Sequence, residues 1–236
     1  MRALVLRLIY NGLNMESTRS ANADIFNHDP DAATYDDEVR DEADPIRTGY
    51  GDTLRWVIRH AEITATSRVL ELGSGTGNLS ALIASCGELV CVDVSEKMEA
   101  IAKCKVRHLL NRRFIKADIL EVFTQELGKF DAVISTYALH HLTEREKQQL
   151  FALVFDHLLP SGCAVFGDLM VQNSSEKDEK IRQYSAKGDQ ATAQAIGEEF
   201  FWLLDTAIAD LVGVGFNVVA QRLSDLSYGL IARKGG

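Results

Sequence analysis

The stretch Val-Leu-Glu-Leu-Gly-Ser-Gly-Thr-Gly, residues 69–77, decides the fold of this chain. Its apolar start predicts a buried strand, and its three glycines at alternate positions predict a tight turn. Because glycine lacks a Cβ, such a turn lets a ligand lie against the backbone. Glu71 places an acid before the turn, which disfavours a phosphate and suits a cationic amine or sulfonium.

The spacing of the glycines differs from two common nucleotide-binding motifs. A dinucleotide fingerprint reads G-x-G-x-x-G, whereas the third glycine here, Gly77, comes one residue too early. A P-loop needs a Lys-Ser or Lys-Thr pair after the glycines, and none follows. A purely structural turn with a solvated acid stays open as an alternative until the downstream segments are considered.

Composition bounds the class of protein. A length of 236 residues suits one large α/β domain, and 46% apolar with 25% charged residues is ordinary for a globular chain. The net charge of −9 argues against a nucleic-acid partner, which needs clustered Lys and Arg. We expect no membrane span, because no apolar run reaches ~18 residues. The four cysteines lack the close pairing of a zinc site, so we expect reduced thiols in a cytoplasmic protein.

The N-terminal part of the chain is predicted to have three segments. We expect residues 1–21 to be an N-terminal extension and residues 22–236 to form a single domain. Residues 1–14 are expected to be either a dispensable extension or the result of an early start codon. Residues 22–45 mix many acids with apolar side chains, which favours a short amphipathic element that covers a site. A helix over residues 49–62 follows from the apolar residues on one helical face.

Strands and helices alternate in the next part of the chain. Strands are predicted at about residues 68–72, 89–92, 113–116, 130–136 and 163–169, with helices at 78–86, 96–107 and after the capping box Thr143–Glu146. This alternation indicates βαβ units and a parallel sheet. Beyond it, residues 171–190 are polar, 191–212 are predicted as one helix, and 216–222 with 227–233 as an antiparallel hairpin.

Distinctive polar residues fall at the carboxyl ends of the predicted strands. They are Glu71 with the glycines, Asp93, Asp118, and Ser135 with Thr136. Ligands of open parallel sheets bind at this edge. Asp93 lies 20 residues after Gly73, the spacing at which an acid can bond the hydroxyls of a ribose. Their convergence favours a ligand-binding role for Asp93 over that of a solvated loop residue.

At these motifs the chain resembles the class I S-adenosylmethionine-dependent methyltransferases, from about residue 35 to the end. The matching stretches are residues 69–77, Val-Cys-Val-Asp-Val-Ser at 90–95, Lys-Ala-Asp at 116–118, Phe-Asp-Ala-Val-Ile-Ser at 130–135 and Leu-Leu-Pro-Ser-Gly at 158–162. The chain looks most like the small-molecule branch, which carries Tyr-Asp before the first helix and Ala-Leu-His-His-Leu after the fourth strand. These motifs are Tyr35-Asp36 and residues 138–142 here.

The resemblance implies an α/β fold with a Rossmann-like, doubly wound, seven-stranded and mostly parallel sheet whose last strand is antiparallel. It also implies that S-adenosyl-L-methionine is the cofactor and S-adenosyl-L-homocysteine its product. Glu71 would support the ammonium group, Gly73 and Gly75 would let the methionine part pass, and Asp93 would hold the ribose. The remaining implied cofactor-binding residues are Tyr35, Val94, Met98, Ala117, Asp118, Ile119 and Ser135, with Asp118 at the exocyclic amine of adenine.

The catalytic residues are harder to assign. Methyl transfer from a sulfonium needs chiefly the alignment of the two reactants, and a base only where the acceptor must first lose a proton. The candidate bases are His140, His141 and Tyr137, with a packing or turn role as the alternative for the two histidines. Asp168, Tyr184 and His28 are further candidates of the same kind.

The acceptor is expected to be a small molecule in a pocket formed by residues 22–45 and 171–204. Phe200, Phe201 and Trp202 are expected either to line that pocket or to belong to the core. No metal site is predicted, and the protein is expected to be a monomer or homodimer. Two alternatives stay open: a non-catalytic module that binds S-adenosylmethionine or S-adenosylhomocysteine, and an NAD-dependent oxidoreductase, which would need the missing fingerprint.

Overall fold

The computed structural model describes residues 18–25, 27–198 and 201–235. The dispensable segment expected at residues 1–14 and the aromatic residue Phe200 lie outside the described residues. The sequence assigns residues 18–21 to the extension. In the structure these residues pack against the domain beside its pocket.

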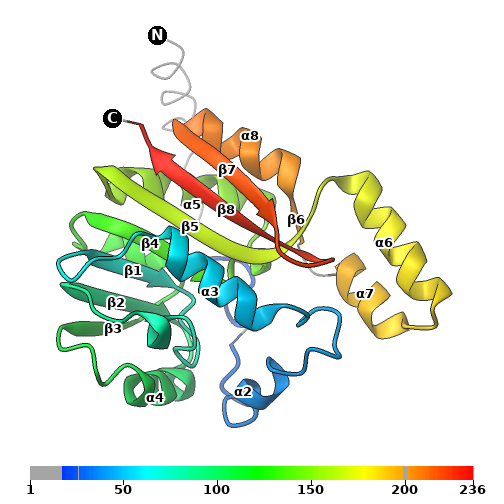
Figure 1. Cartoon of the computed structure of the whole chain (residues 1–236), viewed down its shortest axis with the longest axis horizontal. Coiled ribbons are helices and arrows are strands. Elements are labelled where there is room, and N and C mark those ends of the chain that lie inside the picture. The colour runs from blue at the N-terminus through cyan, green and yellow to red at the C-terminus, as the bar shows by residue number, and fades with distance from the viewer. Residues whose placement is uncertain (1–17, 26, 199–200, 236) are drawn as a thin grey trace.

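The strands of the described residues form one central sheet (Figure 1). The strand order is β3-β2-β1-β4-β5-β8-β7, with the short β6 beside β5. Strands β1 to β5 are mutually parallel, β8 is antiparallel to β5, and β7 is antiparallel to β8. This confirms the predicted mostly parallel sheet with an antiparallel last strand. The strands are β1 Arg68–Leu72, β2 Glu88–Asp93, β3 Arg112–Lys116, β4 Phe130–Thr136, β5 Leu158–Val171, β6 Trp202–Leu203, β7 Phe216–Arg222 and β8 Ser227–Lys234.

Some of the helices begin at a residue whose side chain caps the first turn. Ser95 accepts the backbone N–H of Met98 at the start of α4, and Thr143 with Glu146 forms the predicted capping box of α5. The α-helices are α2 Tyr35–Glu38, α3 Tyr50–His60, α4 Glu96–Lys105, α5 Glu144–His157, α6 Ser174–Ala186, α7 Gln190–Glu198 and α8 Leu204–Val214. Three short 3₁₀ helices are η1 Ser80–Leu82, η2 Glu121–Thr124 and η3 Leu139–His141.

The sheet buries apolar side chains on both faces. Successive residues of β1 point to opposite sides, so Val69 packs with Val57 of α3 while Leu70 packs with residues of α5 and α8. Both layers of helices are therefore needed to cover the sheet, which is the doubly wound arrangement predicted (Figure 1).

The helix predicted over residues 78–86 is wrong beyond its first turn. The structure has only η1 there, and Leu82 is 43% exposed. The backbone N–H of Gly87 donates to the carbonyl of Ser67 at 2.9 Å, so the chain must return to the sheet by that residue. So short a segment leaves little room for a helix, whose first turn is costly to form.

The single helix predicted over residues 191–212 is also wrong. It is interrupted by β6, where Trp202 and Leu203 pair with Met170 and Val171 of β5. The Trp202 side chain is fully buried against Phe151, and this burial with the strand pairing outweighs helical propensity. The polar segment 171–190 contains α6, which the low apolar content of that segment concealed.

The contact between α3 and β8 gives a test of the packing. A Cβ at Gly229 would lie 2.3 Å from a ring carbon of Trp56, so Gly229→Ala forces the indole to move. We expect a loss of roughly 1–3 kcal/mol in the free energy of unfolding, as for other overpacked cores. Urea denaturation measures this value.

Gly213→Ala is the matched control. A Cβ at this residue of α8 meets no atom within 4 Å, so the substitution should be neutral or stabilise the protein by up to about 1 kcal/mol. Equal effects of the two substitutions would contradict the close approach of Trp56 to β8.

Candidate functional site

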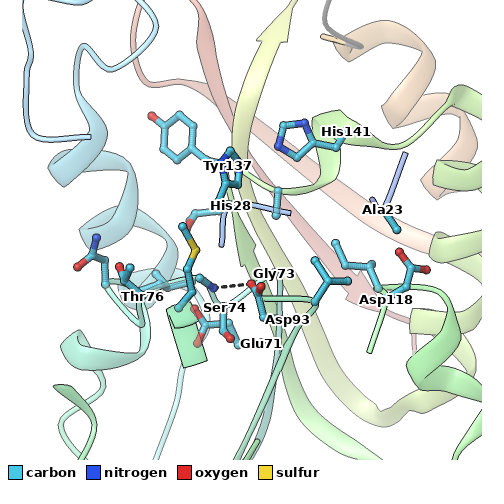
Figure 2. A pocket seen from close by; sticks show the side chains of 18 of the residues that line it. Ala23, His28, Glu71, Gly73, Ser74, Thr76, Asp93, Asp118, Tyr137 and His141 are labelled. Carbon is cyan, nitrogen blue, oxygen red and sulfur yellow. Dashed lines mark hydrogen bonds between the residues drawn. The ribbon is translucent and has the colours of Figure 1, made fainter. Parts of the chain in front are cut away.

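A pocket opens at the carboxyl ends of the parallel strands (Figure 2). It lies where the strand order reverses between β1 and β4, the usual ligand site of such sheets. It encloses about 830 Å³ of space, a volume that includes the solvent at its open mouth. Side chains from residues 20–35 line one side and those of residues 136–142 line another.

The glycine-rich turn forms the floor of the pocket and needs its glycines. Gly73, Gly75 and Gly77 all have positive φ, at 67°, 50° and 78°. A Cβ at Gly73 would lie 2.3 Å from the Cβ of Ala138 in the turn after β4. Residue 73 must therefore be glycine for two reasons, its backbone conformation and this close approach.

Asp93 ties two turns together at the centre of the site. Its carboxylate accepts the backbone N–H of Gly75 at 2.7 Å and that of Ser95 at 2.8 Å. Burial raises the pKa of Asp93, and these two hydrogen bonds oppose the rise. Asp93 lines the pocket between the glycine turn and α4, so its charge faces any ligand held there.

Glu71 is a buried acid below the glycine turn. Its side chain lines the pocket, although the residue is only 2% exposed. Burial raises the pKa of Glu71 well above its ordinary value, and the nearby charge of Asp93 raises it further. A cationic ligand group beside Glu71 would favour the charged carboxylate.

A second group of predicted residues lines the far end of the pocket. Val94, Met98, Ala117, Asp118 and Ile119 all lie there. Asp118 is 3% exposed and accepts the backbone N–H of Leu120 at 2.9 Å. This end therefore combines apolar side chains, which suit a flat ring, with one acid, which suits a ring amine.

The cover is fastened to the glycine turn by residues that the sequence did not single out. Asp36 of α2 accepts hydrogen bonds from Thr76 at 2.6 Å and from Asn78 at 3.0 Å, and forms an ion pair with Lys105. The Lys105 ammonium also donates to Asn78 at 2.6 Å. The only sequence signal for this network was the pair Tyr35-Asp36, whose Tyr35 lines the pocket.

Two of the three candidate bases face the pocket. His141 and Tyr137 line it, whereas His140 does not. The His140 Nδ1 lies 2.6 Å from the buried carboxylate of Asp168, which also accepts the backbone N–H of Leu139. His140 and Asp168 therefore hold the η3 turn in place, which is the packing alternative considered for His140.

Tyr137 and Ser135 have internal partners. The Tyr137 hydroxyl donates to Thr53 at 3.2 Å, and burial raises the pKa of Tyr137 to about 12. The Ser135 hydroxyl donates to the carbonyl of Leu72 at 2.7 Å, and Ser135 does not line the pocket. Only the main chain of Ser135 is left for a role near a ligand.

In the described part of the chain, only one of the two segments expected to form the acceptor pocket lines the observed pocket. Residues 20–35 line the pocket, but no described residue of 171–204 does. Phe201 and Trp202 are buried in the core, which is the alternative weighed for this aromatic run, and Tyr184 binds Asp225 instead of facing the pocket. His28 and Tyr50 take part in the lining, with the ring centroids of His28 and His141 6.2 Å apart.

Two features are absent among the residues that the structure describes. Among them no three His, Cys, Asp or Glu side chains are placed to hold a metal ion. The same residues include no helix with the length and apolar character to cross a membrane.

Comparison with known proteins gives consistent matches. Residues 69–162 match the family described as "Methyltransferase domain". An uncharacterized methyltransferase of Oceanobacillus iheyensis is 28% identical over 207 residues, covering 86% of this chain and 93% of the relative. One of Bacillus pumilus is 29% identical over 214 residues, with 89% and 96% covered. The crystal structure of magnesium protoporphyrin IX methyltransferase from Synechocystis with bound S-adenosylhomocysteine has a TM-score of 0.64 at 18% identity, covers 90% of this chain and 98% of that chain, and shows the shared fold.

Glu71→Gln should change the stability of the protein and its affinity for the ligand in opposite directions. Because the pKa of Glu71 is raised in the folded protein, its contribution to the free energy of unfolding is fully present when the pH is below the unfolded-state pKa of about 4.3. This contribution declines as the pH rises toward the folded-state pKa of Glu71. The neutral amide removes this decline, so the variant should be the more stable protein at pH 8 and equal to wild type at pH 4.

Binding should change in the opposite direction. The ammonium group of S-adenosylhomocysteine would no longer face a carboxylate, so the Kd of S-adenosylhomocysteine should rise about tenfold or more. Thermal unfolding between pH 4 and 8 and calorimetry provide the two readouts. Parallel pH profiles for wild type and variant would show that Glu71 is not a strained buried acid.

Proposed function

We propose that the chain is a class I S-adenosylmethionine-dependent methyltransferase and that it transfers the methyl group to a small-molecule acceptor by in-line displacement. S-adenosyl-L-methionine is the methyl donor and S-adenosyl-L-homocysteine the product. We place the reaction in the cytoplasm, which the four free thiols of the chain support.

We assign the two ends of the pocket to the two ends of the cofactor. Asp93 would bond the ribose hydroxyls, and Glu71 would face the ammonium group of the methionine part. Val94, Met98 and Ile119 would pack on adenine, and Asp118 would accept from its exocyclic amine. The support for this placement is the order of these side chains along one pocket.

The charge of the pocket lining carries the proposal about the acceptor. The residues that line the pocket include Glu71, Asp93 and Asp118, and in the described part of the chain no Lys or Arg is among them. Such a lining suits a sulfonium and an acceptor that is neutral or cationic, and it disfavours a carboxylate or phosphate next to the nucleophile. Ser20, Asn22, Ala23, His28 and Tyr35 also line the pocket, and this cover favours a small molecule over a polymer.

Alignment of the two reactants accounts for much of the chemistry. The acceptor atom attacks the methyl carbon as the carbon–sulfur bond breaks, and the bonding electron pair stays on sulfur. Holding the reactants in line can supply ~7–11 kcal/mol of the barrier. Tyr50 and Tyr137, whose ring centroids lie 5.1 Å apart, form an apolar wall that would exclude water from this space.

We propose that His28 is the base that removes a proton from the acceptor molecule. Its ring lies against Tyr35 and faces His141, and its ring nitrogens make no hydrogen bond to any described residue. Burial lowers the pKa of His28, so the imidazole is neutral near pH 7 and keeps a lone pair for the proton. Tyr137 is hydrogen-bonded to Thr53 and His140 to Asp168. Burial lowers the pKa of His141 strongly, so its imidazole is a poor proton acceptor, and His28 is the better placed base.

A panel of acceptors tests the proposed function. Formation of S-adenosylhomocysteine is measured with neutral thiols, amines and phenols, each beside a matched compound that carries a carboxylate next to the nucleophile. We expect at least one neutral or cationic class to react, and the added carboxylate to lower kcat/KM by at least about tenfold. Preference for the carboxylate compounds would refute the charge argument.

Asp93→Ala tests the ribose assignment. Loss of hydrogen bonds to a charged group costs about 1.5–3 kcal/mol, so the Kd of S-adenosylhomocysteine should rise on the order of 10- to 100-fold. Calorimetry with a variant shown by circular dichroism to be folded gives the answer, and an unchanged Kd would refute the assignment.

His28→Gln tests the proton acceptor. Glutamine keeps a polar side chain but takes no proton, so kcat should fall about 100-fold while the Kd of S-adenosylhomocysteine changes little. Wild-type activity should decline as the pH falls through the lowered pKa of His28, and this limb should vanish in the variant. His157→Gln, at the end of α5, is the control. A variant with wild-type turnover and an unchanged pH profile would exclude His28 as the base.

A further inference from the structure

The strap formed by residues 20–22 crosses the end of the pocket that we assign to adenine. The Ser20 backbone N–H donates to Asp118 Oδ1 at 2.9 Å, and its hydroxyl donates to Asp118 Oδ2 at 2.6 Å. Both carboxylate oxygens of Asp118 thus receive a donor from the strap. Ser20 and Asn22 line the pocket together with Asp118, and Figure 2 shows Asp118 at its place in the lining.

The carboxylate of Asp118 has little capacity left for a ligand. Its Oδ1 accepts from both Ser20 and the backbone N–H of Leu120, and a carboxylate oxygen offers about two lone-pair sites. Its Oδ2 accepts the Ser20 hydroxyl at the short distance of 2.6 Å. An adenine amine that bonds Asp118 therefore competes with Ser20 for the same acceptor.

The burial of the Asp118 carboxylate explains why Ser20 donates hydrogen bonds to it. Asp118 is 3% exposed, and a buried acceptor without a donor costs roughly 1–3 kcal/mol or more when it is charged. Without a ligand, Ser20 supplies one donor to each carboxylate oxygen, in addition to the backbone N–H groups of Leu120 and Glu121 that donate to Oδ1. With adenine bound, the exocyclic amine can supply a donor in its place.

Among the described residues, the strap makes two further hydrogen bonds to the rest of the domain, one exposed and one partly buried. The Ala21 N–H donates to Glu146 at 2.6 Å, and the Asn22 side-chain amide donates to the carbonyl of His141 at 2.9 Å. Bonds in contact with water are worth little, so the strap can open at small cost. The contact with Asp118 is its most buried attachment.

We propose that the strap is an autoinhibitory gate, in which Ser20 occupies Asp118 in the free enzyme and the adenine amine of the cofactor displaces it. This inference rests on the proposed role of Asp118 toward adenine. It predicts that the strap weakens cofactor binding, whereas a lid that closed over the cofactor would strengthen binding.

Ser20→Ala is the first test. The variant loses the competing hydroxyl, so the Kd of S-adenosylhomocysteine should fall about three- to tenfold, the equivalent of one ordinary hydrogen bond. The association rate should rise in stopped-flow measurements. Ser20→Pro removes the N–H donor as well and should give a further gain. Thr18→Ala is the control, because its exposed hydroxyl makes no hydrogen bond to any described residue.

Two further measurements identify the mechanism. An analogue of S-adenosylhomocysteine with hydrogen in place of the 6-amino group should show no gain with Ser20→Ala, since it offers Asp118 no amine. Hydrogen exchange at residues 18–25 should speed up when S-adenosylhomocysteine saturates the wild-type enzyme, because the Ser20 N–H is released.

The outcomes separate this inference from the function on which it rests. If wild type fails to bind S-adenosylhomocysteine, the cofactor placement falls and the gate with it. If wild type binds but Ser20→Ala shows an equal or higher Kd, or the strap becomes protected on binding, the gate is refuted and the cofactor placement stands.

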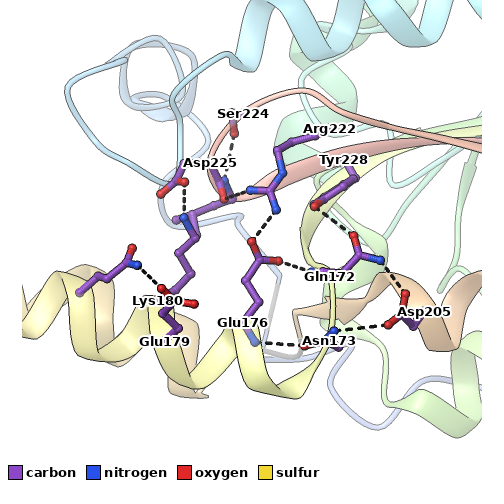
Figure 3. A network of polar contacts seen from close by, with 12 residues as sticks. Gln172, Asn173, Glu176, Glu179, Lys180, Asp205, Arg222, Ser224, Asp225 and Tyr228 are labelled. Carbon is purple, nitrogen blue, oxygen red and sulfur yellow. Dashed lines mark hydrogen bonds and ion pairs between the residues drawn. The ribbon is translucent and has the colours of Figure 1, made fainter.

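The helical pair outside the pocket is anchored independently of the strap. α6 is tied to the β7–β8 turn by the ion pairs Glu176–Arg222 and Lys180–Asp225 (Figure 3). Because these contacts share no residue with the strap, opening of the gate leaves them intact. Hydrogen exchange in α6 should therefore stay unchanged when S-adenosylhomocysteine binds, which provides an internal reference for the strap measurement.

Discussion

The close approach of Gly73 to Ala138 is the constraint on which the site depends. It brings the turn after β1 against the turn after β4, so that the ends of neighbouring strands enclose one pocket. The approach needs a fixed partner turn, and Asp168 provides it by accepting backbone N–H groups of Leu139 and His140. Tyr137 enters this turn with φ of 49°, a strained conformation for a tyrosine that the surrounding bonds maintain. A buried acid on β5 thus sets the geometry of a glycine on β1.

The alternation of strands and helices could be predicted because buried parallel strands carry a strong local signal. Apolar runs that end in Asp93 or Thr136 mark strands covered on both faces, and the capping box at Thr143 marks a helix start. The errors arose where tertiary contacts decide the structure. The pairing of Trp202 with β5 and the return of the chain at Gly87 depend on residues far away in sequence, which no local pattern reports.

The residues that we propose for the cofactor could be brought together from the sequence more easily than those of the cover, for the same reason. Glu71, Asp93 and Asp118 follow strands directly, so strand order alone brings them to one edge. The residues of the cover reach the pocket through loops, and Lys105 and Thr76 become partners of Asp36 only after the cover has folded over the glycine turn. Polar residues in loops have many possible partners, so their pairing could not be read from spacing.

The charge of the pocket explains why its parts are held by so many backbone donors. Glu71 and Asp93 are buried acids with raised pKa values, and no Lys or Arg of the described chain lines the pocket beside them. Backbone N–H groups from Gly75 and Ser95 stabilise Asp93 without adding a competing positive charge. The field of the pocket therefore stays negative and available to a cationic ligand. A protein cation in the same place would stabilise the free enzyme more, but it would repel the sulfonium that the methyl transfer requires.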